Sequence, residues 1–387
     1  MKKEVFIVDG LRTAIGGLGK SLSSVSAVDL AGEVIRELIE RNKIDASSID
    51  EVILGNTVSA GLGQNPARQA LVKGGIPPKI PAFTVNKVCG SGLKSAILST
   101  QAILCGDADI IIAGGTENVS QCPKFVPKDD ESENLQPNSL INDGLWCNLY
   151  GDHMGMIAEY TAEKFDISRE EQDAYALSSQ EKAVSAQKEG LFDGEIVPVT
   201  LGDGEVFKAD EKPRANTSME KLSRIPSAFK EGGTVTAGNS PAPADGAAGL
   251  LLASEDGLKK TGAKPLARIL GYATSAVEPE LVFTAAGLAI EKCLKESNLD
   301  ISDIDLFEIN EAFAVQSLVT NKSVGLDESK LNVFGGTIAL GHPLGASGAR
   351  GLVTLLNALK VRGKKTGLTA VCLGGGCAVA MIVEIVK

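Results

Sequence analysis

The stretch "NKVCGSGLKSAILST" at residues 86–100 places Cys89 before two glycines and a serine, with an amphipathic run directly after them. Cys89 is either a small buried hydrophobe or a nucleophile, and the two readings imply different proteins. The glycines allow a tight turn, and a helix that starts here would point its free N–H groups and positive end at the sulfur. We expect this setting to lower the pKa of the Cys89 thiol and to supply an oxyanion hole.

A second stretch, "GASGARGLVTLL" at residues 345–356, resembles the first and aligns Ser347-Gly348 with Ser91-Gly92. Two further pairs match in the same order and at nearly the same spacing: "IDEVILGN" (49–56) with "IDLFEIN" (304–310), and "IIIAGG" (110–115) with "AVCLGGG" (370–376). Such repetition predicts an internal duplication related by a pseudo-two-fold axis. The alternative is that α/β units simply look alike, which the shared Ser-Gly turn and the spacing disfavour.

The chain of 387 residues has 43 glycines and only 4% aromatic residues, which suits an α/β protein with many tight turns. Alternating strand and helix patterns predict a mostly parallel sheet with helices on both faces. We expect an N-terminal half at 1–118, completed by about 244–268, and a C-terminal half at 269–387. An inserted loop domain at 119–243, the natural place for a lid or a ligand-binding lobe, would lie between them.

Charge and cysteine usage narrow the function classes. The formal net charge of −11 argues against nucleic acid as a partner. The N-terminus does not fit a signal peptide, and no window reaches membrane-spanning length, so no membrane partner is expected. Seven cysteines show neither a paired framework nor metal-ligand spacing. The expected location is a reducing cytoplasm, and no metal is expected.

The inserted region differs from the two halves in its sequence pattern, with a capped helix followed by a basic stretch. "DISREEQDAYALSSQEKAVSAQKEG" predicts a helix with a capping box, Ser168 and Glu171, and a terminal glycine, Gly190. A basic stretch follows, which either meets phosphates or is simply solvated on a surface helix. It contains Lys208, Lys212, Arg214, Lys221, Arg224 and Lys230.

Three more candidates accompany Cys89. His342, one of only two histidines, opens the helix that mirrors the one after Cys89, so the pseudo-two-fold would bring both helix starts to one crevice. Asn310 and Glu311 follow a predicted strand, where α/β sheets place ligands, although Asn310 could instead cap the next helix. Cys372 ends a strand before three glycines, and its alternative role is core packing.

The segments "NKVCGSGLK", "NEAF", "GGTIALGHPLGASGAR" and "CLGGG" resemble, in order, four signature blocks of the thiolase family, specifically the acetyl-CoA acetyltransferase type. The resemblance covers essentially the whole chain. It implies a duplicated α/β/α/β/α layered core with an inserted loop domain, residues 119–243, that binds coenzyme A. It also implies acetyl-CoA and acetoacetyl-CoA as substrates, no permanently bound cofactor, and a homodimer or homotetramer.

The resemblance implies a role for each catalytic candidate. Cys89 takes the acyl group as a thioester, and His342 deprotonates it and helps to polarise a thioester oxygen. Cys372 is the second acid or base. Asn310 holds a water that forms one oxyanion hole with His342, and the N–H groups of Cys89 and Gly374 form the other. Because both cysteines should reach one substrate carbon, oxidation could close a disulfide between them.

Coenzyme A contacts also follow from the resemblance. His153 is expected near the pantetheine and Arg214 near the nucleotide. The family usually has a serine where this chain has Pro241, so Ser240 is expected to substitute for it. Phe283 stands in place of a family glycine and adds bulk at the acyl pocket, which predicts a preference for acetyl and acetoacetyl groups.

Alternatives remain open at this point. One is a broader 3-ketoacyl-CoA thiolase, and another is a non-catalytic acyl-CoA- or lipid-binding relative. Retention of Cys89, Asn310, His342 and Cys372 disfavours the latter. A ketoacyl synthase fits poorly with Cys372. The acidic segment 128–136 departs from the family's usual tetramerisation segment, which makes a dimer the firmer expectation.

Overall fold

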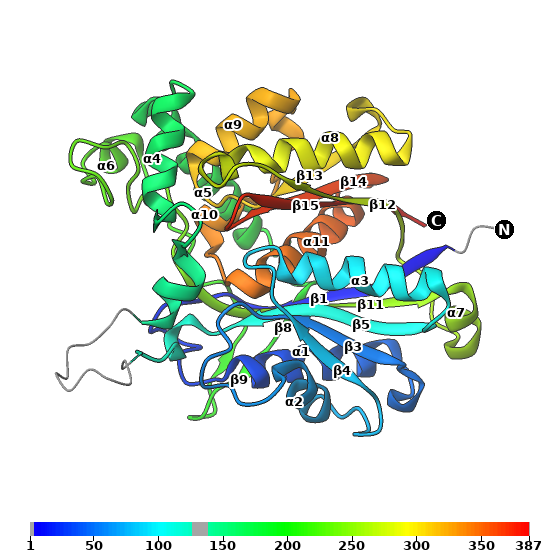
Figure 1. Cartoon of the computed structure of the whole chain (residues 1–387). Coiled ribbons are helices and arrows are strands. Elements are labelled where there is room, and N and C mark those ends of the chain that lie inside the picture. The colour runs from blue at the N-terminus through cyan, green and yellow to red at the C-terminus, as the bar shows by residue number, and fades with distance from the viewer. Residues whose placement is uncertain (1–3, 126–137, 387) are drawn as a thin grey trace.

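The computed structural model describes residues 4–125 and 138–386, so the acidic segment 128–136 lies outside the described residues. Its elements stack in five layers, in which two outer helical layers enclose two sheet layers and a central pair of helices (Figure 1). The predicted α/β/α/β/α layered core is therefore confirmed.

The two sheet layers match in strand order over four strands, and the first has one strand more. The first runs β1 (Val5–Thr13), β11 (Ala244–Ser254), β5 (Ile110–Glu117), β3 (Glu51–Gly55) and β4 (Ala82–Val85). The second runs β12 (Ala267–Ala276), β15 (Cys377–Ile385), β14 (Thr366–Leu373) and β13 (Leu306–Ile309). Each begins with two antiparallel pairings and continues with a parallel one, and β1 joins β12 through two residue pairs. This repeated topology confirms the internal duplication.

The expectation of a mostly parallel sheet is wrong, because both layers are mixed. In each half one strand returns antiparallel beside the strand that follows the central helix: β11 pairs with β5, and β15 pairs with β14. β15 returns directly through the glycine turn after Cys372, whereas β11 returns only after the inserted region. The βαβ rhythm describes only the pairings β3–β4, β3–β5 and β13–β14.

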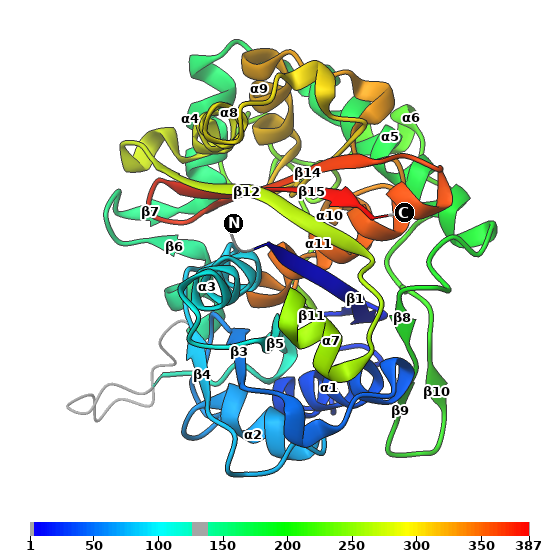
Figure 2. The ribbon, with the colours of Figure 1, turned by 90° about the vertical axis from the view of Figure 1, so that its right-hand side faces the viewer.

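Helices fill the other three layers (Figures 1 and 2). The two central helices are α3 (Ser91–Cys105) and α11 (Leu344–Val361). The outer helices are α1 (Ala27–Asn42) and α2 (Pro66–Lys73) below, with α8 (Ala285–Ser297) and α9 (Ala314–Val324) above. Smaller elements beside the core are β2 (Gly16–Gly17), α7 (Glu255–Thr261) and α10 (Thr337–Leu340).

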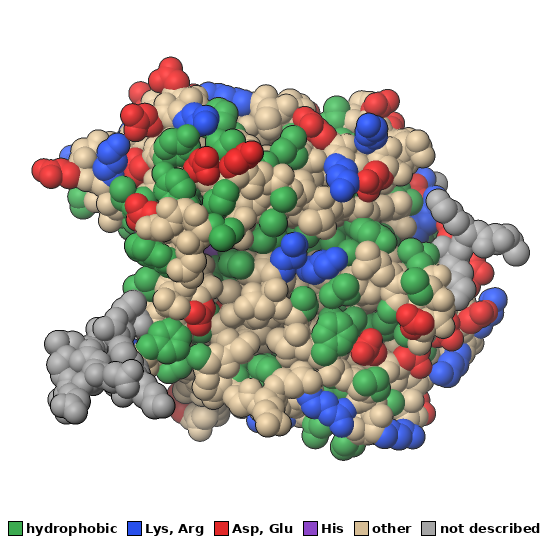
Figure 3. All heavy atoms as spheres, viewed as in Figure 1, with side chains coloured by type: hydrophobic (Ala, Val, Ile, Leu, Met, Phe, Trp, Pro, Cys, Tyr) green, Lys and Arg blue, Asp and Glu red, His purple; other side chains and the backbone are tan. Residues whose placement is uncertain are grey.

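The inserted region packs around the layers on more than one side, and one of its short strands, Ile196–Val197, pairs with β1 (Figure 2). Its elements are β6 (Trp146–Cys147), β7 (Asp152–His153), α4 (Met154–Lys164), α5 (Arg169–Lys188), β8 (Ile196–Val197), β9 (Val199–Thr200), β10 (Val206–Phe207) and α6 (Met219–Ser223). The predicted capping box is present at the start of α5, where Ser168 and Glu171 satisfy each other's backbone N–H groups. Figure 3 shows hydrophobic side chains spread over the face viewed in Figure 1, interspersed with charged ones.

Local contacts repeat along with the topology. Asp50, before β3, accepts the N–H groups of Asp109 and Ile110 through its Oδ2 at 2.7 and 2.8 Å. Asp305, before β13, accepts the N–H groups of Lys365 and Thr366 through its Oδ2 at 2.9 Å each. Both carboxylates therefore anchor the start of the strand next to their own, which explains why the sequence repeats an aspartate at these two places.

The two central helices touch at their glycines. A Cβ atom added to Gly92 would lie 2.9 Å from the backbone nitrogen of Ala349, and one added to Gly348 would lie 2.7 Å from the backbone nitrogen of Leu93. Because the obstructing atoms are backbone, neither helix can accept even a methyl group without moving. The repeated Ser-Gly pair thus sets the distance between the two halves.

One part of the chain, Val88–Cys105, is long and apolar enough to cross a membrane by length and composition alone. This corrects the expectation that no window reaches that length. In the fold these residues form α3 and the turn before it, and α3 is packed between the two sheet layers, which accounts for its apolar character.

We expect Gly348→Ala to lower the melting temperature, even though alanine favours helix over glycine. Forcing α3 and α11 apart should cost about 1–3 kcal/mol, more than the gain of about 0.5–1 kcal/mol in helix propensity. Gly202→Ala is the control, because a Cβ atom there meets nothing within 4 Å. Thermal unfolding of both variants checks the expectation, and an unchanged melting temperature for Gly348→Ala would contradict it.

Candidate active site

Cys89 lies just after a strained turn between β4 and α3. Val88 has a φ of 48°, in the left-handed region that β-branched residues rarely adopt. The turn is held by three contacts: the Val88 N–H donates to Asn86 Oδ1 (2.9 Å), and the Val88 carbonyl accepts from Ser91 Oγ (2.6 Å) and Thr57 Oγ1 (3.1 Å). Strain of about 1–3 kcal/mol held in this way commonly marks a functional site.

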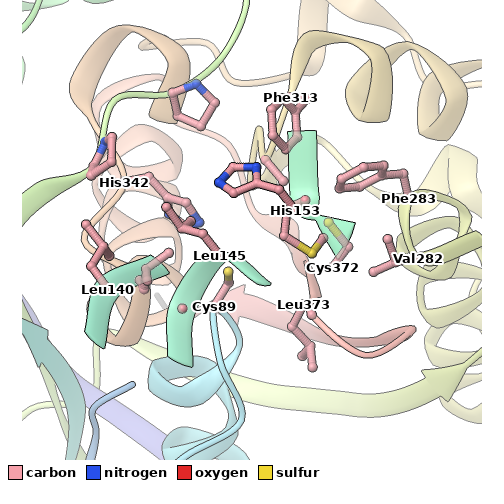
Figure 4. A pocket seen from close by; sticks show the side chains of 17 residues that line it. Cys89, Leu140, Leu145, His153, Val282, Phe283, Phe313, His342, Cys372 and Leu373 are labelled. Atoms are coloured by element: carbon pink, nitrogen blue, oxygen red, sulfur yellow. The ribbon is translucent and has the colours of Figure 1, made fainter. Parts of the chain in front are cut away.

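The thiol of Cys89 faces a mostly apolar pocket of about 620 Å³ (Figure 4). In the figure, the side chains of Cys89 and Cys372 lie near each other at the pocket, Cys89 just before α3 and Cys372 near the end of β14. The remaining lining residues are Leu140, Gly144, Leu145, His153, Met154, Pro241, Pro243, Val282, Phe283, Ala312, Phe313, His342, Leu344, Leu373 and Gly374. The structure thus brings together Cys89, His342, Cys372, Gly374 and His153 of the predicted site residues.

The expectation of a lowered Cys89 pKa is wrong. Burial raises the pKa of the thiol to about 12, although the N–H groups of Cys89 itself and of Gly374 face the sulfur and act in the opposite direction. The carboxylate of Glu117 adds to the increase. Loss of water around the thiolate therefore outweighs the nearby N–H groups, so Cys89 rests as a thiol and needs a base.

His342 is the base candidate in reach of the pocket. Its Nδ1 lies 2.6 Å from Ser347 Oγ, and its Nε2 has no hydrogen-bond partner among the described residues. Burial lowers the pKa of the imidazole to about 3, and the guanidinium of Arg350 contributes to the decrease. A neutral imidazole with an unengaged nitrogen can accept a proton, which is the property a resting thiol requires.

Cys372 lies near the end of β14 and lines the pocket, whereas Asn310, directly after β13, is not among the residues that line it. Asn310 follows β13 and is 3% exposed, and neither polar atom of its amide has a partner in residues 4–125 or 138–386. The alternative role as a helix cap is wrong, because α9 begins after Phe313. Cys372 is fully buried, so its packing role is real, but it also lines the pocket. Burial, followed by the nearby Cys89, raises its pKa.

Family models match nearly the whole chain: the thiolase N-terminal domain over residues 5–256 and the thiolase C-terminal domain over residues 263–385. The chain belongs to the thiolase family. It is 46% identical to an acetyl-CoA acetyltransferase of Allochromatium vinosum (99% of this chain, 100% of the relative) and 48% identical to one of Escherichia coli (99% of each).

Solved structures agree on the fold. The Bacillus anthracis acetyl-CoA acetyltransferase superposes with a TM-score of 0.96 at 37% identity, covering 100% of this chain and 99% of that one. A human mitochondrial 3-ketoacyl-CoA thiolase superposes with the same TM-score at 38% identity, again covering 100% and 99%. Equal scores for both types mean that the fold alone does not separate them.

A second pocket of this thiolase, of about 610 Å³, is lined by two more of the predicted residues, Arg214 and Ser240, but not by Asn310. Lys212 and Lys221 line it as well, whereas the other three basic residues of the stretch do not. Ser240 Oγ is buried without a partner among the described residues. This pocket combines positive charge with polar groups, which suits an anionic ligand.

The segment 240–243 separates the two pockets of this thiolase. Ser240 and Ala242 line the basic pocket, while Pro241 and Pro243 line the apolar one. The Ala242 carbonyl also accepts the backbone N–H of His342 at 2.9 Å. One short stretch of backbone therefore borders both pockets and holds the base candidate.

Phe283 lies at the side of the pocket formed by the 3₁₀ segment η4 (Pro279–Thr284). It is 1% exposed, and its ring meets Phe313 edge-on with centroids 5.3 Å apart. Phe313 in turn contacts Phe229, which stacks on His153. Sequence reasoning singled out Phe283 and His153 but missed the aromatic row that joins them.

Two further results concern residues around the site. Glu311 is structural, because its carboxylate accepts hydrogen bonds from Ser179 Oγ, Asn332 Nδ2 and the Ile338 N–H at 2.9–3.0 Å.

All seven cysteines lie in the described part of the chain and are free thiols, so the disulfide between Cys89 and Cys372 stays a prediction. In the same part of the chain, no group of three or more metal-ligand side chains is placed to hold a metal.

Because burial raises the Cys89 pKa, we expect alkylation of Cys89 by iodoacetamide to accelerate continuously from pH 7 to beyond pH 9. The reactive thiolate forms a growing fraction over that whole range, so no plateau should occur near neutrality. Peptide mass spectrometry of Cys89 over time measures the rate, with the exposed Cys105 as an internal reference. A plateau below pH 8 would show a resting thiolate instead.

Proposed function

We propose that this thiolase is an acetyl-CoA C-acetyltransferase, which reversibly condenses two acetyl-CoA into acetoacetyl-CoA and coenzyme A through an acetyl-Cys89 intermediate. The observation that carries the proposal is that two thiols, Cys89 and Cys372, line one apolar pocket together with a neutral His342. One thiol serves as a nucleophile and the other as an acid or base, which Claisen chemistry requires. The acetyl-CoA acetyltransferases at 46% and 48% identity support the same assignment.

The first half-reaction is acyl transfer. Nε2 of His342 takes the proton of Cys89, and the thiolate attacks the carbonyl carbon of acetyl-CoA. The bond from that carbon to the sulfur of coenzyme A breaks, and Cys372 gives its proton to the departing sulfur. The result is acetyl-Cys89, free coenzyme A, an imidazolium at His342 and a thiolate at Cys372.

The second half-reaction is condensation. The Cys372 thiolate takes a proton from the methyl group of a second acetyl-CoA, and the enolate carbon attacks the carbonyl carbon of acetyl-Cys89. The bond to the Cys89 sulfur breaks, Cys89 recovers its proton from His342, and acetoacetyl-CoA is released. Cys372 ends as a thiol, so both cysteines return to their resting state.

Negative charge develops on a carbonyl oxygen in each half-reaction, and the site has groups for both. We assign the N–H groups of Cys89 and Gly374, which face the Cys89 sulfur, to the oxygen of the acylated cysteine. His342 Nε2–H and a water held by Asn310 are assigned to the enolate oxygen, because the buried amide of Asn310 lacks a protein partner among the described residues. Removing one such donor costs about 10²–10³ in rate.

The basic pocket is the proposed site of the coenzyme A nucleotide. Lys212, Arg214 and Lys221 would meet its phosphates, and Ser240 would offer its buried hydroxyl. The pantetheine arm would then pass the segment 240–243 and enter the apolar pocket beside His153. No permanently bound cofactor takes part in this scheme, and the coenzyme A thioesters are the substrates.

The second candidate function is a broader 3-ketoacyl-CoA thiolase, favoured by the equal structural likeness to the human enzyme. The aromatic pair Phe283 and Phe313 favours the acetyl-CoA C-acetyltransferase instead, because the two rings fill space that a longer acyl chain would need. A purely acyl-CoA-binding protein would have no use for the second thiol, Cys372.

We also propose a homo-oligomer, with a dimer as its basic unit, in a reducing cytoplasm. β4 pairs only with β3 within the described chain, and Phe83 on this edge strand is 37% exposed. An open edge with an apolar side chain suits pairing with a second copy. The seven free thiols are consistent with a reducing location.

Incubation with acetyl-CoA should attach one acetyl group to Cys89, because the covalent intermediate forms before the second substrate is needed. Intact-protein and peptide mass spectrometry measure the adduct. We expect none in Cys89→Ser and an undiminished one in Cys105→Ser, which changes an exposed cysteine far along α3. An enzyme without any adduct on Cys89 would refute the proposed function.

Phe283→Ala should raise kcat/KM for 3-ketohexanoyl-CoA relative to acetoacetyl-CoA by about tenfold or more, since one methylene in an apolar pocket is worth about 10–200-fold. Steady-state thiolysis kinetics across chain lengths measure the ratio. Leu288→Ala, which truncates an exposed residue on the adjoining α8, should leave it unchanged. Efficient cleavage of 3-ketohexadecanoyl-CoA by the unaltered protein would contradict the role of Phe283.

A further inference from the structure

The repeated Ser-Gly turn places one buried serine at the start of each central helix. In the N-terminal half, Ser91 Oγ accepts the backbone N–H of Lys87 at 2.8 Å. Because an N–H group can only donate, the hydroxyl proton of Ser91 is free to go to the Val88 carbonyl, 2.6 Å away. Ser91 thus joins an N–H donor and a carbonyl acceptor, and in doing so it holds the strained turn before Cys89.

In the C-terminal half, Ser347 makes the matching pair of contacts. Its Oγ lies 3.0 Å from the Pro343 carbonyl and 2.6 Å from Nδ1 of His342. A histidine nitrogen, unlike a backbone N–H, can be donor or acceptor according to the tautomer. If the Ser347 proton goes to Pro343, as that of Ser91 goes to Val88, then Nδ1 must carry a proton and donate it to Ser347.

We propose that Ser347 is a positioning residue that holds neutral His342 in the Nδ1–H tautomer, leaving the lone pair of Nε2 toward the pocket for the Cys89 proton. The proposal deepens the proposed function, because it identifies what makes the base competent. It follows from the duplication: the serine that holds the nucleophile's backbone in one half holds the base's ring in the other.

The same hydrogen bond serves the protonated state. When Nε2 takes the Cys89 proton, Nδ1–H keeps Ser347 Oγ as its acceptor and no rearrangement is needed. A hydroxyl stabilises imidazolium less than a carboxylate would, and Arg350 on the next turn of α11 opposes the positive charge. The imidazolium therefore persists only while the reaction supplies a counter-charge, and the resting site stays neutral.

The other histidine of this chain supplies an internal reference. The Gly155 N–H donates to His153 Nδ1 at 3.0 Å, so neutral His153 must carry its proton on Nε2. The two histidines are therefore assigned opposite tautomers. Because the chain has only these two, labelling histidine alone with ¹⁵N gives a spectrum in which each ring can be identified by substituting the other.

The first measurement is proton–nitrogen correlation of the imidazole rings in the full-length protein at neutral pH. We expect Nδ1–H for His342 and Nε2–H for His153. In Ser347→Ala, the His342 signals should lose the single Nδ1–H pattern, while those of His153 stay unchanged. Observation of Nε2–H for His342 in the unaltered protein, or an unchanged Nδ1–H tautomer in Ser347→Ala, would overturn the proposal.

The second measurement is the rate of Cys89 acetylation by acetyl-CoA. We expect Ser347→Ala to slow it by about 10–100-fold, within the range that general base catalysis contributes, and Ser347→Thr to restore most of the rate by keeping the hydroxyl. The matched control is Ser95→Ala, which removes a fully buried hydroxyl from the other central helix. Ser95 contacts the Gly92 and Gly114 carbonyls and no histidine, so acetylation should stay within about twofold.

The two failures can be told apart. Absence of any acetyl-Cys89 in the unaltered protein refutes the proposed function itself, whereas the tautomer is read without substrate. If the unaltered protein is acetylated and Ser347→Ala reacts no more slowly than Ser95→Ala, the positioning role is wrong. Should Ser347→Ala fail to fold, the tautomer of the unaltered protein and the rate of Ser347→Thr still decide the outcome.

Discussion

The contact between α3 and α11 at Gly92 and Gly348 is the constraint on which the rest of this molecule depends. Because backbone meets backbone there, the starts of both helices are fixed relative to each other with no flexible side chain between them. Cys89 lies just before one helix start and His342 just before the other. The close approach therefore brings the nucleophile and its base to a single pocket, although they are far apart in the sequence.

A second contact fixes the start of α11 against the N-terminal sheet. The carboxylate of Glu117, at the end of β5, is fully buried and accepts the N–H groups of Gly345, Thr57 and Val58 and one from the Asn56 amide, at 2.8–3.1 Å. It thereby links the N-terminal sheet to the start of α11. Its charge also raises the Cys89 pKa, so the group that joins the halves also helps to keep the nucleophile protonated until the base acts.

Much of the fold was predictable because duplication leaves signals in the sequence. The repeated aspartates Asp50 and Asp305 and the Ser-Gly turns revealed two equivalent halves, and the second of these turns led to His342. The antiparallel return of β11 left no such signal, because its partner β5 lies on the far side of the inserted region. Periodicity records which face of an element is buried, not the direction of its neighbour.

The residue types of the candidate site could be predicted from the sequence, whereas the direction of the Cys89 pKa shift could not. A helix start suggested a lowered thiol pKa, but the balance between local N–H groups and burial depends on how much protein surrounds the sulfur, and that is a property of the whole fold. The left-handed conformation of Val88 could not be predicted either, because valine rarely adopts it and its presence in the sequence therefore indicates an extended or helical backbone. Leu140 and Leu145 line the pocket from the two ends of a short π-helical turn, Leu140–Leu145, which is too short to show periodicity in the sequence, so only their position in space reveals them.

The backbone segment 240–243 adds a different kind of connection. Its alternate residues face the basic and the apolar pocket, and its Ala242 carbonyl holds the His342 N–H. Affinity gained by a remote, unreactive part of a ligand in the basic pocket can therefore be converted into a fixed position of the group that moves the proton. A truncated substrate that lacks the part bound in the basic pocket should therefore have a lower kcat as well as a lower affinity, because that part helps to fix the position of His342.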